Sequence, residues 1–228
     1  MRRGLRLFSS VLIAAGLLLL ADAALTVAWK EPVSALYARF GQEQLQDDLR
    51  TLERAAPPPV QRRALRALPR PRARIAFLAR ALKRSAKPGQ AIGRIRAGSI
   101  GLSQVVVAGT ATGDLRKGPG HFPATPLPGV HGTVAVAGHR TTYGAPFRKL
   151  DALDRRDLIE LEMPYGRFTY RVHRTRIVPP TATWVTRRVD HDRLVLTACH
   201  PLYSAAQRIV VFARLERVVA RGAALKRA

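Results

Sequence analysis

The chain has 228 residues, of which 47% are apolar, so it is long enough for one ordinary domain with additional segments. Lys and Arg number 39 against 15 Asp and Glu, and a net charge of +24 indicates nucleic acid, anionic lipid or an anionic wall polymer as a partner. The charge is spread along the whole chain, and aromatic residues make up only 6%, so a nucleic-acid partner is not expected. A single cysteine excludes an intramolecular disulfide.

The first segment contains an apolar stretch, residues 7–29, whose only charge is Asp22. This length is sufficient for a helix to cross a bilayer. The alternative is a cleaved signal peptide, because residues 21–23 satisfy the A-x-A cleavage pattern. The apolar run continues through residues 24–29, so we favour an uncleaved transmembrane helix, with residues 1–30 as cytoplasmic tip and anchor. Either interpretation places the remainder outside the plasma membrane.

Residues 31–91 are basic and rich in helix-forming residues and proline. Apolar residues recur at helical spacing over residues 31–55, and Pro57 to Pro59 end this helix. A second, basic amphipathic helix is predicted over residues 75–84. The segment is either an arm that binds the membrane surface or wall, or a stalk that sets the distance from the bilayer. We favour the stalk.

From residue 92 the pattern changes to short apolar or alternating runs separated by turns. No helical pattern of ten to fifteen residues separates these runs, so an all-β domain is predicted over residues 92–217, followed by a basic tail, residues 218–228. Six or more strands over about 120 residues fit a closed or partly closed antiparallel barrel.

The last two apolar runs of this domain form a predicted hairpin. Cys199 ends the first run and Arg208 opens the second, so the two residues are expected side by side. A thiolate is the reactive form of cysteine, and a nearby cation lowers the pKa of a thiol. The alternative is that Cys199 is a small buried core residue.

His139 is placed like Cys199, because it closes an apolar run and precedes a polar loop. A Cys and a His at two strand ends match a nucleophile and its base. His139 as an ordinary turn histidine remains the alternative at this point.

Other cysteine chemistries do not fit the spacing. A cysteine phosphatase requires an arginine six residues after the cysteine, and Ala205 occupies that position. A structural zinc site requires closely spaced Cys and His pairs, whereas Cys199 and His200 are adjacent and point to opposite faces of a strand. We therefore expect no metal and no cofactor.

Several stretches together resemble the sortases, cysteine transpeptidases of Gram-positive bacteria, and most of all the class E type found in actinobacteria. The resemblance covers residues 92–215 and the junction after the apolar stretch. The stretches that carry it are residues 29–37, 114–121, 138–147, 196–201 and 204–208.

This resemblance implies a closed eight-stranded β-barrel with a Cys–His–Arg site, on the extracellular side of a single-pass membrane anchor. Cys199 would attack the Thr–Gly carbonyl of a C-terminal sorting signal on a secreted protein, first of all Leu-Ala-x-Thr-Gly. An amine of a peptidoglycan precursor or a pilin would then resolve the thioacyl enzyme. His139 would move the protons, and Arg208 would donate hydrogen bonds to the substrate backbone or the oxyanion.

One residue departs from the family pattern. Ala198 stands before the cysteine, where the family usually has Thr, so we expect a hydroxyl to be missing from the site. The predicted substrate-side residues are Phe122, Thr141, Tyr143 and Thr197, each of which is otherwise explained by ordinary loop packing. Two alternatives stay open: another exported Cys/His peptidase or wall transpeptidase, and an inactive surface barrel that binds peptides.

Overall fold

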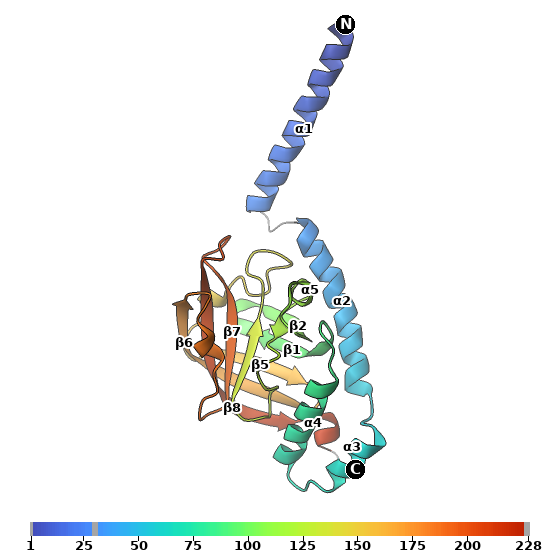
Figure 1. Ribbon diagram of the computed structural model, residues 1–228, viewed down its shortest axis with the longest axis vertical. Helices are drawn as coiled ribbons and strands as arrows, with labels where there is room; N and C mark the ends of the chain where they lie inside the picture. Colours follow the sequence, from blue (N-terminus) through green and yellow to red (C-terminus); the bar gives the residue numbers. More distant parts are fainter. Residues whose placement is uncertain (1, 29–31, 226–228) are drawn as a thin grey trace.

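The structure, a computed structural model, describes residues 2–28 and 32–225, and its centre is a closed barrel of eight strands (Figure 1). The strands follow one another around the barrel in the order β1-β2-β3-β4-β7-β8-β6-β5. This arrangement confirms the predicted closed eight-stranded barrel. The strands are β1 (Ala91–Ala97), β2 (Leu102–Ala108), β3 (Gly120–His121), β4 (Thr133–Ala137), β5 (Leu158–Met163), β6 (Gly166–Val178), β7 (Arg193–His200) and β8 (Gln207–Ala220).

The alternation of side chains along β7 shows how the barrel is packed. Leu194, Leu196 and Ala198 belong to the main core inside the barrel. Val195 lies on the opposite face, in a second apolar cluster. Successive side chains of a strand point to opposite faces, and each fully buried leucine contributes about 1.5–3 kcal/mol. Both faces of β7 are therefore covered by apolar packing.

Two strand pairs are parallel, which corrects the predicted antiparallel barrel. β4 pairs with β7 and β2 pairs with β3 in parallel, whereas the other pairs around the barrel are antiparallel. A parallel pair requires a long connection, and the chain between β4 and β7 provides one that includes the β5–β6 hairpin. A short apolar run indicates a buried strand but not the neighbour with which it pairs, so the sequence did not reveal this pairing.

Helix α2 (Pro32–Arg54) lies along the side of the barrel, so this part of the predicted stalk is not a free spacer (Figure 1). Leu45 and Leu49 are buried against Val105 of β2. The Gln42 side chain accepts a hydrogen bond from the Val105 N–H at 2.8 Å and donates one to the Val105 carbonyl at 3.2 Å. The buried leucines and this bidentate contact attach the helix to the sheet.

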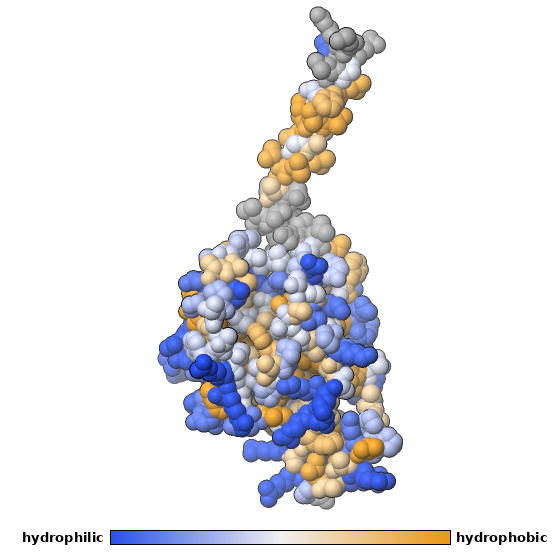
Figure 2. Space-filling view, viewed as in Figure 1, coloured by the Kyte–Doolittle hydropathy of each residue, from blue (hydrophilic) through white to orange (hydrophobic). Residues whose placement is uncertain are grey.

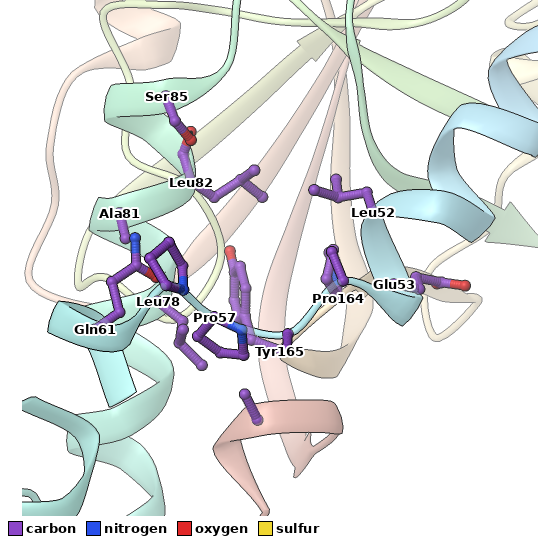
Figure 3. A pocket seen from close by; sticks show the side chains of 14 residues that line it. Leu52, Glu53, Pro57, Gln61, Leu78, Ala81, Leu82, Ser85, Pro164 and Tyr165 are labelled. Atoms are coloured by element: carbon purple, nitrogen blue, oxygen red, sulfur yellow. The ribbon is translucent and has the colours of Figure 1, made fainter. Parts of the chain in front are cut away.

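Two further helices of the predicted stalk also pack on the barrel. Helix α3 (Pro59–Arg66) and helix α4 (Pro71–Ser85) each begin with a proline, whose fixed backbone angle suits the first helical position. Leu65, Ile75 and Leu78 join the main core, so the predicted amphipathic helix uses its apolar face against the barrel. An apolar groove remains between the end of α2, α4 and the turn from β5 to β6. Figure 3 shows its lining, which includes Leu52, Pro57, Leu82, Pro164 and Tyr165.

Helix α1 (Arg2–Ala28) extends away from the barrel (Figure 1). Its large apolar side chains are exposed and form the orange surface of the arm in Figure 2. Within residues 2–28 and 32–225, no helix combines the length and the apolar character needed to cross a membrane. The transmembrane helix predicted over residues 7–29 is therefore not found, and Trp29 lies outside the described residues.

The barrel is slightly longer than the range predicted for it. β1 begins at Ala91, and β8 continues to Ala220, so the boundary predicted after residue 217 falls inside a strand. Ala224 follows in a short 3-10 turn and joins the main core. The remaining short elements are helix α5 (Thr112–Leu115) and the 3-10 turns Gly98–Ile100, Leu150–Ala152 and Thr183–Thr186.

Candidate active site

The parallel pairing of β4 and β7 brings the predicted base and nucleophile to the same edge of the barrel. Ala137 is opposite Thr197 in this pair. The Gly138 N–H donates a hydrogen bond of 3.1 Å to the Thr197 carbonyl, which continues the pairing one step beyond β4. His139 and Cys199 each lie two residues beyond the last paired residues. Equal spacing from a parallel register brings them to the same edge of the barrel.

Cys199 lies on the outer face of the barrel. The preceding residue, Ala198, is 3% exposed and belongs to the interior core. Because strand side chains alternate, Cys199 points away from that core, and it is a half-buried free thiol. The interpretation of Cys199 as a core residue is therefore wrong.

The alternation of side chains along β7 also shows which way Ala198 points, and therefore whether its lack of a hydroxyl affects the site. The Ala198 methyl group faces the interior of the barrel, so a threonine here would place its hydroxyl in the core. No hydroxyl is removed from the outer face that carries Cys199. The expectation of a missing hydroxyl in the site is corrected by this side-chain direction. Thr197 is half-buried, and Val195 shares its face in the second cluster.

Arg208 is placed by the β7–β8 hairpin. It is directly opposite Cys199 in the antiparallel register. Val210 and Phe212, at alternate positions of β8, belong to the outer cluster, so Arg208 shares their face. Its Nη1 donates hydrogen bonds of 2.9 Å to the carbonyls of Ala205 and Gln207. The structure thus places Cys199 and Arg208 on one face, and His139 follows β4 at the same edge of the barrel.

An apolar floor continues from these residues along the outer face. The cluster consists of Ala135, Val178, Val185, Val195, Val210 and Phe212. Phe122 packs against it and donates its backbone N–H to the Ala135 carbonyl at 2.9 Å. Phe122 and Thr197, both predicted on the substrate side, therefore lie on the face that carries Cys199. Apolar surface beside a few polar groups is typical of ligand sites.

His139 is partly enclosed by the loop that follows it. Its Nδ1 lies 3.3 Å from the Thr142 hydroxyl, and its ring is 5.1 Å from the ring of Tyr143 at an angle of 43°. Nε2 is buried and has no hydrogen-bond partner within the described residues. Burial first, and then the positive charge of Arg116, lower the pKa of His139 below its usual value of 6.5. The imidazole is thus biased toward its neutral form, which can accept a proton.

The loop after His139 is held by close packing. The Phe147 N–H donates a hydrogen bond of 3.0 Å to the His139 carbonyl, and the Phe147 ring is fully buried. A Cβ at Gly138 would lie only 2.7 Å from that ring, so glycine is required where the loop folds back. Thr141, the fourth predicted substrate-side residue, is half-buried in this loop.

Tyr143 connects this loop to two segments outside the barrel strands. Its ring lies 6.4 Å from the ring of Tyr37 on α2, and Arg116 Cζ is 5.5 Å from its ring centre. Its backbone N–H donates to the Ser34 hydroxyl at 3.2 Å. Tyr37 and Arg116 were not predicted as site residues, although both lie in stretches that carried the family resemblance. The contact of Tyr37 with Tyr143 depends on the packing of α2 against the barrel, which the sequence did not predict.

Within the described residues, no group of three or more His, Cys, Asp or Glu side chains is arranged to hold a metal ion.

The surroundings of His139 predict how its pKa responds to a charge change. Arg116→Gln should raise the pKa of His139, because it removes a like charge, but burial should still hold the pKa below 6.5. A pH titration of the His139 ring signals by NMR measures this change, with Arg84→Gln on the exposed end of α4 as control. A His139 pKa that is unchanged or lower in Arg116→Gln contradicts the electrostatic account.

Because the pKa of His139 in the folded chain is below that in the unfolded chain, the contribution of His139 to stability is complete above about pH 6.5. It decreases as the pH falls from there.

Comparison with known proteins identifies the family of this chain. The family model of the sortase domain matches residues 95–216. Sortase D of Bacillus subtilis (strain 168) is 33% identical over 138 residues, which are 58% of this chain and 68% of the relative. The structure of sortase E from Streptomyces avermitilis is 29% identical with a TM-score of 0.54, over 59% of this chain and 93% of that chain.

A further solved structure supports the fold alone. The Sortase D5 transpeptidase of Clostridium perfringens is 21% identical with a TM-score of 0.63, over 78% of this chain and 99% of that chain. The matched family domain covers more than half of the present sequence and includes the three residues at the barrel edge. The chain therefore belongs to the sortase family, whose members are cysteine transpeptidases.

Proposed function

We propose that this chain cleaves a C-terminal sorting signal between Thr and Gly and transfers the new carboxyl end to an amine. The observation that supports this most strongly is the position of Cys199 opposite Arg208 on one outer face, with His139 following β4 at the same edge of a sortase barrel. Cys199 and Arg208 are spaced by the β7–β8 register, and His139 follows two residues after the last pair of β4 with β7. A nucleophile, a base and a hydrogen-bond donor are the groups that acyl transfer requires.

The reaction proceeds in two acyl-transfer steps. The Cys199 thiol gives its proton to His139, and the thiolate attacks the Thr carbonyl carbon. The Thr–Gly C–N bond then breaks, and His139 passes this proton to the leaving amine. An acceptor amine then attacks the thioester and loses its proton to His139, and the C–S bond breaks to return the Cys199 thiolate. The net result exchanges one amide for another.

Arg208 stabilises the charge that develops on the carbonyl oxygen. In the described part of the chain, its hydrogen bonds to Ala205 and Gln207 both use Nη1. Nε and Nη2 are then available as donors to the substrate. A guanidinium remains charged at every physiological pH and presents its donors in a planar fork, which suits this role better than that of a base.

The substrate class is a secreted protein that carries a sorting signal, and Leu-Ala-x-Thr-Gly is the first candidate. Phe122 and Thr197 lie on the outer face, and Tyr143 lies beside His139, so these residues are proposed to contact the signal. Thr141, in the same loop, is proposed as a polar contact. The acceptor is an amine of a peptidoglycan precursor or of a pilin, and the reaction takes place outside the cell.

Helix α1 is proposed to attach the enzyme to the plasma membrane. Exposed apolar surface of this extent marks a site of interaction. The side chains that form it are Leu7, Phe8, Val11, Leu12, Ile13, Leu17, Leu18, Leu19 and Leu20, each more than half exposed.

Flotation with lipid vesicles tests this attachment. The full chain should float with the vesicles, and the double variant Leu18→Glu/Leu19→Glu should lose that binding because it introduces two charges into the apolar surface. The control, Leu36→Glu, places a charge at an exposed leucine of α2 and should still float. Equal flotation of the double variant and the wild type would rule out attachment through this surface.

Mass spectrometry of the intact protein tests the nucleophile. Incubation with a Leu-Ala-x-Thr-Gly peptide should add the peptide up to Thr to the protein, and an added amine should remove it. Cys199→Ala should form no adduct and show no turnover, because Cys199 is the only thiol. Full activity of Cys199→Ala contradicts the proposal. Adducts with muropeptides alone would instead assign a wall transpeptidase, and binding without any adduct would assign a peptide-binding barrel.

Arg208→Lys tests the role of the guanidinium, because it keeps the positive charge but loses the planar set of donors. We expect kcat to fall by about 10²–10³, the loss typical of removing one oxyanion donor. Arg217→Lys, an exposed position on the same strand, is the matched control and should keep wild-type kcat. Turnover of Arg208→Lys close to that of the control would refute this role.

A further inference from the structure

Arg140, the residue after the candidate base, is deeply buried although it is charged. It is 3% exposed, and its side chain makes three polar contacts. Nη1 lies 2.8 Å from His200 Nδ1, Nη2 lies 2.8 Å from the Asp151 carboxylate, and Nε donates to the Arg148 carbonyl at 3.3 Å. A buried charge is stable only where such partners surround it.

The contact between Arg140 and His200 joins the two segments that carry His139 and Cys199, one residue further along each segment. Arg140 follows His139, and His200 follows Cys199. His200 is next to Cys199 on β7 and points to the opposite face, where Arg140 contacts it. The backbone pairing of β4 with β7 reaches only to the hydrogen bond from Gly138 to Thr197. The side-chain contact therefore joins the two segments beyond the point where the backbone ladder ends.

The direction of this hydrogen bond defines the state of His200. A guanidinium has only donors, so His200 Nδ1 must accept and the neutral ring must carry its proton on Nε2. The Asp151 carboxylate balances the charge of Arg140. The side chain of Asp151 is 57% exposed, whereas that of Arg140 is buried. Arg148 and Asp151 belong to the loop and turn that follow His139. Arg140 thus connects that loop, the base segment and the nucleophile strand.

We propose that Arg140 is a positioning residue that holds the His139 and Cys199 segments in register through His200. The proposal rests on the function proposed above. His139 must remain aligned with the sulfur during both acyl transfers, and a displacement of 1 Å in such a constellation can reduce the rate about a hundredfold. Because Arg140 lies on the opposite face, its loss should affect kcat and leave KM unchanged.

The first experiment compares Arg140→Met with a matched control at another buried arginine. Arg74 on α4 is 5% exposed and donates to the carbonyls of Leu68, Pro69 and Ala224. Both substitutions remove three hydrogen bonds and a buried charge, so both should lower the melting temperature. Arg140→Met should reduce kcat about a hundredfold at unchanged KM, whereas folded Arg74→Met should keep wild-type kcat. Equal kcat values for the two folded variants overturn the proposal.

The second experiment changes His200, which is half-buried, and remains decisive if Arg140→Met does not fold. His200→Asn supplies an acceptor oxygen near the position of Nδ1, whereas His200→Leu supplies none. We expect the kcat of His200→Asn to stay within a few-fold of wild type. The kcat of His200→Leu should fall as that of Arg140→Met does. Equal loss in both variants, or loss in neither, overturns the proposal.

Alkylation of Cys199 separates this proposal from the proposed function. Cys199 is the only cysteine, so a small thiol reagent reports on it alone. His200→Leu should slow alkylation several-fold, because the displaced sulfur is no longer aligned with His139, the candidate base, and His200→Asn should not. If the wild type turns over no sorting peptide, the proposed function fails, and these alkylation rates decide the positioning role. Alkylation of His200→Leu at the wild-type rate would then overturn it.

Discussion

The parallel register of β4 and β7 is the constraint on which the candidate active site depends. These strands come from distant parts of the chain, and His139 and Cys199 each follow two residues after their last pair, Ala137 with Thr197. The β7–β8 hairpin then adds Arg208 directly opposite the cysteine. Strand positions are more rigid than loop positions, so the geometry of the three groups is largely set before a substrate binds. Acyl transfer benefits from such preorganisation.

The division of the sheet into two faces decides which side chains can act. A shift of one residue in the register would turn Cys199 into the core and Ala198 toward the substrate. The interior leucines around Ala198 and the outer cluster around Val195 both oppose this shift. The contact between Arg140 and His200 opposes it again at the strand ends. The same packing that stabilises the barrel therefore keeps the thiol on the reacting face.

The sequence predicted the features that depend on local patterns. Cys199 opposite Arg208 follows from one hairpin, and the apolar run before His139 predicted a strand, which ends two residues earlier, at Ala137. The parallel pairing was not predictable, because strand partners far apart in the chain leave no local signal. The packing of Leu45 and Leu49 against the barrel was also missed, because an amphipathic helix looks the same whether its apolar face meets a sheet or a membrane. The contact of Tyr37 with Tyr143 follows from that packing and was missed with it.

The most direct test of the register is a disulfide between its two ends. His139→Cys introduces a second thiol two residues beyond the last paired residue of β4, as Cys199 is on β7. A disulfide forms between these positions only if the register continues and keeps their Cα atoms about 4.4–6.8 Å apart. Under mild oxidation, this variant should lose both thiols, and peptide mapping should join residues 139 and 199. Arg140→Cys, which points to the opposite face, should keep both thiols. A disulfide in Arg140→Cys and none in His139→Cys would contradict the register and the active site built on it.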